Sequence, residues 1–134
     1  MRIMLDTNIL VSAIFFPSVQ TKNLVRELSE NHRIILCDYV IDELRLVTER
    51  KFPDRLEALD SFFRELPYEL IYTPKSVPDN APVIRDVKDQ EILNTAITEN
   101  VDIFLTGDQD FLVLEIEHPE ILTMTEFEQQ YIVD

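Results

Sequence analysis

Two aspartates each stand just after a short apolar segment of the sequence. Asp6 follows residues 2–5, and Asp108 ends the short polar stretch that follows residues 103–105. Short apolar runs are typical of buried strands, and the carboxyl ends of parallel strands meet at one edge of a sheet. Two parallel strands would therefore bring both carboxylates to the same edge. Taken singly, Asp6 also suits the cap of a following helix, and Asp108 suits a turn.

Two more acids lie on predicted helices, close to the faces that are expected to be buried. Glu43, in the stretch 38–51, lies about 60–70° around the helix from the centre of an apolar stripe. Asp89, in the stretch 86–100, aligns with the apolar stripe of its own helix, where it also complements the helix dipole. A solvated carboxylate is the ordinary alternative for each residue alone. The stripes consist of Val40, Leu44 and Val47 beside Glu43, and of Leu93 and Ala96 beside Asp89.

The four acids Asp6, Glu43, Asp89 and Asp108 predict a metal centre if they converge. Carboxylates held close together repel one another, and a bound cation offsets that repulsion. Hard oxygen ligands suit Mg²⁺ or Mn²⁺ rather than zinc, and both histidines of the chain lie outside this acidic set. A site with one or two such ions activates water and holds a phosphodiester for hydrolysis.

Five polar residues near these acids are candidates for supporting roles. Asp110 is a candidate metal ligand, directly or through water, whereas Asp86 is expected to cap its own helix. Asn8 and Thr106 suit hydrogen bonds that orient the carboxylates, with local backbone bonds as their ordinary alternative. Ser12 lies one helical turn after Asn8, so we expect it to face the same cleft.

The elements that must position these residues alternate between strands and helices. This alternation implies right-handed crossovers and a parallel sheet covered on both faces, so we predict a three-layer α/β/α domain. Residues 73–85, with three of the seven prolines, are expected to form a loop, and residues 106–108 a turn. The predicted strands are 2–5, 34–36, 68–72, 103–105 and 120–123, and the predicted helices cover 9–16, 20–30, 38–51, a stretch from 53, 86–100 and a stretch from 125.

Length, charge and composition limit the possible functions. The 134 residues, 46% of them hydrophobic, suit a single domain over 1–134 with its own core. The net charge of −14 excludes a surface that coats nucleic acid broadly, but it permits a small site neutralised by metal. The single cysteine, Cys37, favours a reducing compartment, so we expect a cytoplasmic protein. No apolar run reaches the ~20 residues of a membrane helix, so we expect no membrane association.

At the level of whole motifs, the sequence resembles the PIN-domain family of metal-dependent ribonucleases, which includes the toxins of many bacterial toxin-antitoxin pairs. The resemblance spans nearly the whole chain and implies a PIN-like fold. It also implies that Asp6, Glu43, Asp89 and Asp108 match the four acidic positions of the family. Four segments carry it in this order: MLDTNILVSA at 4–13, VIDEL at 40–44, RDVKDQEILNTA at 85–96 and LTGDQDFL at 105–112.

The resemblance implies an endoribonuclease that depends on Mg²⁺ or Mn²⁺ and hydrolyses RNA, with an antitoxin protein as partner if the protein is a toxin. It also implies a homodimer, since PIN-domain proteins often pair. A second reason to expect a homodimer is that Phe15, Phe16 and the apolar segment 131–133 are difficult for a small domain to cover. The alternative is that both phenylalanines are core residues and that the C-terminus packs on its own sheet.

Other classes of function fit the sequence less well. A dinucleotide-binding enzyme needs several glycines in its phosphate loop, and the chain has one, Gly107. A phosphoacceptor domain or an aspartate-nucleophile phosphatase would place a second acid beside Asp6, where Thr7 and Asn8 stand. A non-catalytic acidic module that binds metal or a protein is the remaining alternative to a nuclease.

Overall fold

Five parallel strands form the centre of the protein in the computed structural model, which describes residues 1–79 and 81–132. They lie in the order β3-β2-β1-β4-β5, and every neighbouring pair is parallel. The chain adds β2 and β3 on one side of β1, and β4 and β5 on the other. The strands are β1 (Arg2–Leu5), β2 (Arg33–Cys37), β3 (Tyr68–Ile71), β4 (Ile103–Leu105) and β5 (Glu120–Leu122).

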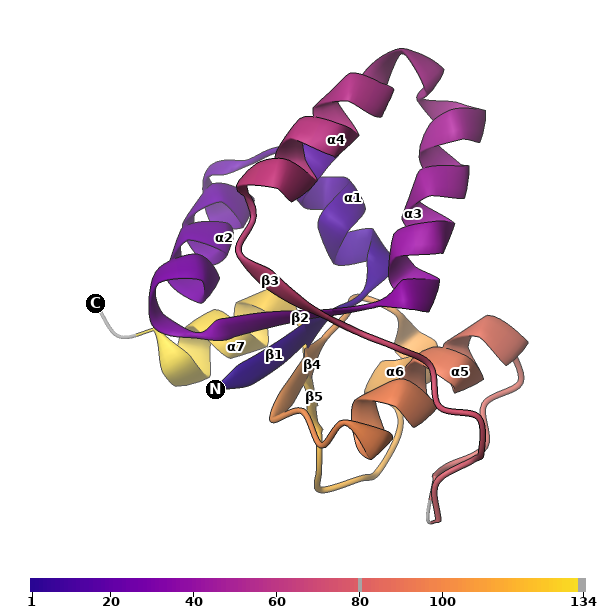
Figure 1. Cartoon of the computed structure of the whole chain (residues 1–134). Coiled ribbons are helices and arrows are strands. Elements are labelled where there is room, and N and C mark those ends of the chain that lie inside the picture. Colours follow the sequence, from indigo (N-terminus) through magenta and orange to yellow (C-terminus); the bar gives the residue numbers. More distant parts are fainter. Residues whose placement is uncertain (80, 133–134) are drawn as a thin grey trace.

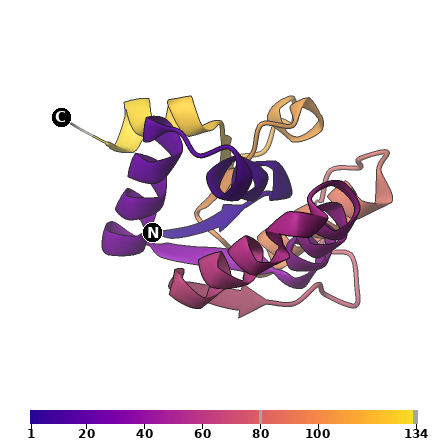
Figure 2. The same cartoon turned by 90° about the horizontal axis from the view of Figure 1, so that it is seen from above.

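Helices cover both faces of this sheet (Figures 1 and 2). Helices α1 to α4 pack against one another on one face, α5 and α6 lie on the other, and α7 lies beside α2. Right-handed crossovers explain this division, because the chain runs toward β3 in its first half and toward β5 in its second. The helices are α1 (Thr7–Phe15), α2 (Val19–Asn31), α3 (Asp38–Lys51), α4 (Leu56–Glu65), α5 (Val87–Thr98), α6 (Gln109–Leu112) and α7 (Met124–Tyr131), with a 3₁₀ turn at Pro53–Arg55.

These layers confirm the predicted three-layer α/β/α architecture with a parallel sheet. None of the helices in the described part of the chain is long and apolar enough to cross a membrane.

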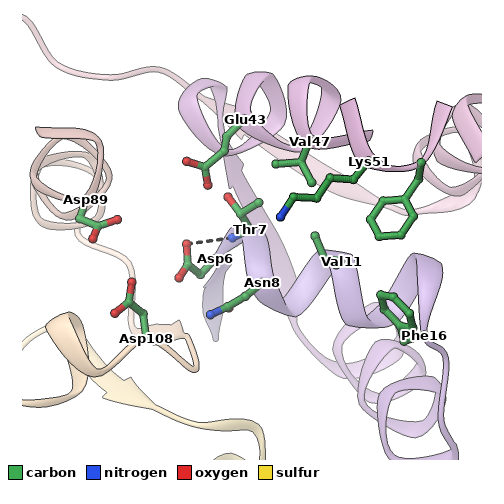
Figure 3. A pocket seen from close by; sticks show the side chains of 11 residues that line it. Asp6, Thr7, Asn8, Val11, Phe16, Glu43, Val47, Lys51, Asp89 and Asp108 are labelled. Atoms are coloured by element: carbon green, nitrogen blue, oxygen red, sulfur yellow. Dashed lines mark hydrogen bonds between the residues drawn. The ribbon is translucent and has the colours of Figure 1, made fainter. Parts of the chain in front are cut away.

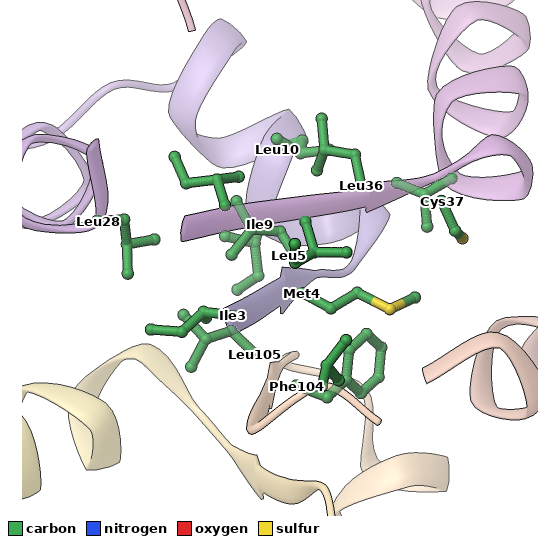
Figure 4. Close-up of a cluster of buried hydrophobic side chains, with 14 of the residues drawn as sticks. Ile3, Met4, Leu5, Ile9, Leu10, Leu28, Leu36, Cys37, Phe104 and Leu105 are labelled. Carbon is green, nitrogen blue, oxygen red and sulfur yellow. The ribbon is translucent and has the colours of Figure 1, made fainter. Parts of the chain in front are cut away.

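The core is built around the central strands, which are covered on both faces (Figure 4). Ile3, Met4 and Leu5 of β1 are each at most 2% exposed, as expected for a central strand of a parallel sheet. Phe15 also belongs to the core: it is buried and stacks on Phe52 with ring centroids 4.7 Å apart. The expectation that Phe15 is difficult to cover was therefore wrong, because Phe52 at the end of α3 covers it.

Most predicted boundaries agree with the structure within two residues, and residues 73–85 contain no helix or strand among those described. The short helix α6 was not predicted, because one helical turn is too short to show periodicity. Asp38 is the first residue of α3, directly after Cys37. Its carboxylate accepts the backbone N–H and the hydroxyl of Thr73, at 2.9 and 2.7 Å, and so holds the start of the loop that follows β3.

Candidate metal centre

A pocket of about 400 Å³ lies at the carboxyl edge of the sheet (Figure 3). Asp6 enters it from the end of β1, Glu43 from α3, Asp89 from α5 and Asp108 from the segment after β4. Their carboxylates point toward a common space in Figure 3. The tertiary structure thus brings together four acids that are up to 102 positions apart in the sequence.

Asp6 is the buried member of this set, at 6% exposure. It caps α1, because its Oδ1 accepts the backbone N–H of Thr7 at 2.8 Å. Burial raises the pKa of Asp6 from 3.8 to about 6. Hydrogen bonds from Thr106 and Thr7 oppose this shift, whereas the charges of Glu43 and Asp108 add to it. A positive charge in the pocket would therefore stabilise the ionised form of Asp6.

Thr106 connects the two strand ends that carry acids. Its hydroxyl is buried and donates to Oδ2 of Asp6 at 2.7 Å. Oγ1 of Thr106 in turn accepts the backbone N–H of Asp108 at 3.0 Å. One side chain therefore orients the Asp6 carboxylate and holds the segment that presents Asp108.

Asp89, Asp108 and Asp110 form a close group of acids, with one oxygen from each lying within 4.8 Å of the others. Two helix caps place them: Asp86 accepts the N–H of Asp89 at 3.0 Å, and Asp108 accepts that of Asp110 at 2.9 Å. Burial raises the pKa of Asp89 to about 7, and the charges of Asp108, Asp86, Asp6 and Asp110 contribute in that order. The predicted cap at Asp86 is confirmed.

Glu43 reaches the pocket from the half-buried side of α3. The buried residues of this helix are Val40, Leu44 and Thr48, whereas Val47 is half-buried and lines the pocket. The sequence had predicted Val47, rather than Thr48, as the third residue of the buried stripe on this helix. A threonine can occupy this buried position because its hydroxyl donates to the carbonyl of Leu44 at 2.7 Å.

Thr7 supplies a polar atom that has no partner within the described protein. The residue is 7% exposed and lines the pocket, and Figure 3 shows it between Asp6 and Glu43. Its hydroxyl is buried and makes no hydrogen bond to any described residue. Buried polar groups are nearly always paired, so this hydroxyl is free to pair with a water or ion that the pocket binds. Oxygen donors, raised carboxyl pKa values and an unpaired hydroxyl together fit a hydrated divalent cation such as Mg²⁺ or Mn²⁺.

Asn8 and Ser12, both predicted to lie at the site, are placed differently. Asn8 is exposed and lines the pocket. Ser12 is not among the described lining residues, and its carbonyl accepts the N–H of Phe16 at 3.1 Å. The pocket face of α1 instead runs through Thr7 and Val11, four residues apart, and Ser12 lies about 100° further around the helix.

Sequence reasoning missed six lining residues: Thr7, Val11, Phe16, Val47, Lys51 and Phe52. The sequence does hold a signal for Lys51, because Glu43, Val47 and Lys51 are spaced four apart and share one face of α3. It holds no such signal for the unpaired hydroxyl of Thr7, because a missing partner is a property of the tertiary structure.

The chain matches a family model and solved structures over most of its length. A model described as PIN domain matches residues 2–110. VapBC2 from Rickettsia felis, solved bound to a DNA fragment from their promoter, contains a chain that superposes with a TM-score of 0.73 and 24% identity, over 92% of this chain and 98% of that one. DNA-bound VapBC from Salmonella typhimurium contains another, with a TM-score of 0.72, 18% identity and the same two coverages. No curated protein matches the sequence significantly.

Proposed function

This chain belongs to the PIN-domain family, and from that premise we propose that it is a metal-dependent endoribonuclease that hydrolyses RNA phosphodiester bonds. The observation that carries the proposal is the convergence of Asp6, Glu43, Asp89 and Asp108 on one pocket. Such a group of carboxylates is unfavourable without a cation and suits the metal-assisted hydrolysis of a phosphodiester.

We propose that these four carboxylates hold Mg²⁺ or Mn²⁺, with Asp110 as a further ligand. A divalent ion bound there supplies an activated water and offsets the negative charge of the phosphodiester. In this proposal the attacking group is that water, so no side-chain nucleophile is needed.

Polar side chains around the acids have positioning roles in this proposal. Thr106 keeps the Asp6 carboxylate oriented and ties it to Asp108. Thr7 offers its unpaired hydroxyl to a water or phosphate oxygen in the pocket. Asn8, exposed at the edge of the pocket, offers its amide to the same oxygens.

Cleavage of single-stranded RNA under controlled metal conditions tests the function. We expect hydrolysis of a labelled oligonucleotide in Mn²⁺ or Mg²⁺, and none in EDTA, because the acids without a cation repel phosphate. Excess Mn²⁺ should restore the reaction. Cleavage that persists in EDTA would overturn the mechanism, and metal binding without cleavage in either ion would favour the non-catalytic module.

We propose an antitoxin protein as the partner and the cytoplasm as the compartment. The resemblance to PIN-domain toxins supports the partner, and both similar structures contain VapBC bound to DNA. Cys37 is buried and unpaired, which supports a reducing compartment.

We also propose a homodimer formed through the face between α2 and α7. Val19, 75% exposed, and Ile132, half-buried, line a groove there, and Tyr131 nearby is 37% exposed. The apolar segment 131–133 was expected to be difficult to cover, but its last residue, Val133, lies outside the described residues. A second copy would cover these apolar side chains, which lie in the groove beside the polar residues Gln20, Asn23, Glu128 and Gln129.

Light scattering after size-exclusion chromatography tests the dimer. We expect a mass of twice 15.7 kDa at micromolar concentration. Val19→Asp should shift the protein to the monomer mass, because the dimer would bury the new charge without a partner. A monomer mass for the parent protein throughout the micromolar range would exclude the dimer.

A further inference from the structure

The pocket extends beyond the acids, between α1 and α3, toward two aromatic rings at its far end (Figure 3). Val11 and Val47 line its middle, and Phe16 and Phe52 line its end. The acids therefore occupy one part of a longer pocket whose remaining wall is apolar. A metal ion and its ligands do not need this second part.

Phe16 lies at the end of α1 and is 61% exposed, whereas no other phenylalanine in the described part of the chain is exposed. Its ring is held edge-on against Phe52, with centroids 5.8 Å apart. Phe52 is in turn stacked on the buried ring of Phe15. The core thus supports the exposed ring from behind. Because the ring is already held in place, stacking a flat ligand on it would cost little side-chain entropy.

Lys51 adds a positive charge to the same pocket. It is the basic residue among the described lining residues, and Figure 3 shows its side chain directed back toward Thr7 and Asn8. None of the ion pairs found among the described residues uses Lys51, whereas Arg45 on the same helix pairs with Asp60 at 3.1 Å. On a chain with a net charge of −14, this ammonium group is placed where a phosphate would meet it.

We propose that Phe16 and Lys51 form a nucleotide subsite for single-stranded RNA. A base stacks on the exposed face of Phe16, and the ammonium of Lys51 binds a phosphate next to the bond that is cut. The inference rests on the proposed function, and it adds the two side chains that recognise the strand. A base inside a duplex cannot present its face to an aromatic side chain, whereas an unpaired base can. The charge of Lys51 favours an RNA strand over an apolar segment of protein, which would leave the ammonium unpaired.

Fluorescence anisotropy of a labelled single-stranded RNA in Mn²⁺ tests the subsite by binding. The parent and every variant carry Asp6→Asn in this measurement, so that the RNA is not consumed by cleavage. Phe16→Ala and Phe16→Leu are both expected to weaken binding at least about fivefold, because leucine restores apolar volume but not a stacking face. Phe16→Trp should bind as well as the parent. Equal binding by Phe16→Leu and the parent would overturn the stacking role.

Lys51→Met is expected to weaken binding and to reduce the slope of log affinity against log salt by about 0.7, the value for one phosphate contact to a single strand. Lys22→Met is the matched control, because Lys22 is exposed on α2 and is not a described lining residue. The same loss in both variants would show a general charge effect and would overturn the phosphate contact.

Abasic RNAs locate the stacked base. We expect that removing the base at one position of the RNA weakens binding to the parent. The same abasic RNA should bind Phe16→Ala as tightly as the intact RNA does, since the stacking contact is already lost in this variant. If RNA binding depends on Phe16 but the parent protein does not cleave the RNA, the subsite is supported and the proposed nuclease function is contradicted. Cleavage with no position coupled to Phe16 would contradict the subsite alone. If Phe16→Ala changes the oligomeric mass measured by light scattering but leaves the RNA affinity unchanged, the ring belongs to a protein interface instead.

Discussion

Replacing Asp6 with asparagine is expected to lower the rate of metal-dependent RNA cleavage at least about 100-fold, which corresponds to roughly 3 kcal/mol of lost transition-state stabilisation. Asparagine keeps the size of the side chain and its oxygen can still accept the N–H of Thr7. It removes the negative charge at the buried end of β1, where Asp6 adjoins both Glu43 and Asp108. The change therefore affects the proposed cation site more than the fold.

The exposed Asp54 provides the matched control, because Asp54→Asn makes the same chemical change outside the pocket. Rates should be measured with saturating Mn²⁺ on proteins whose thermal unfolding shows that they are folded. Asp108→Asn is expected to behave like Asp6→Asn. If Asp6→Asn cleaves RNA as fast as the parent, Asp6 does not bind the catalytic ion and the proposed mechanism fails.

Free of metal, the protein is expected to lose stability as the pH rises from about 4 to about 7, and Mn²⁺ or Mg²⁺ is expected to restore it. The pKa values of folded Asp6 and Asp89, about 6 and about 7, both lie above the ordinary value of 3.8. As the pH rises, the unfolded chain therefore releases these protons first, which favours unfolding. For the buried Asp6 the loss amounts to about 3 kcal/mol once the pH exceeds its folded pKa.

Thermal unfolding at pH 5 and pH 8, in EDTA and in Mn²⁺, measures this effect. In EDTA, Asp6→Asn should unfold at a higher temperature than the parent at pH 8, and the difference should shrink at pH 5, where Asp6 is already largely protonated. Mn²⁺ should raise the unfolding temperature of the parent more at pH 8 than at pH 5, because protons compete with the ion. If neither Mn²⁺ nor Mg²⁺ changes the unfolding temperature of the parent at pH 8, the acids do not bind a shared cation.

Thr7 separates a metal effect from a packing effect in the same measurement. Thr7→Val removes the unpaired buried hydroxyl and keeps the shape of the side chain, so the metal-free protein should be as stable as the parent or up to about 1 kcal/mol more stable. Its gain in unfolding temperature with Mn²⁺ should be smaller, because the hydroxyl would no longer contact the bound ion or its water. Thr7→Ser retains the hydroxyl and should respond to Mn²⁺ like the parent.

Several properties of this protein are determined by the sequence alone, because they depend on neighbours along the chain. Strands and helices follow from local periodicity and apolar content, and an acid such as Asp6 can be identified because it ends an apolar run. Parallel topology then requires that acids at strand ends share one edge of the sheet. The sequence predicted in this way both the α/β architecture and the four acids that line the pocket.

Other properties were decided only by tertiary packing. Phe15 and Phe16 are adjacent and chemically identical, yet one is buried against Phe52 and the other is 61% exposed. Whether the Thr7 hydroxyl has a partner, and whether Lys51 points into the pocket, depends on side chains contributed by other elements. The physical reason is that periodicity is set by bonded geometry over a few residues, whereas burial and pairing depend on which distant segments pack against each side chain.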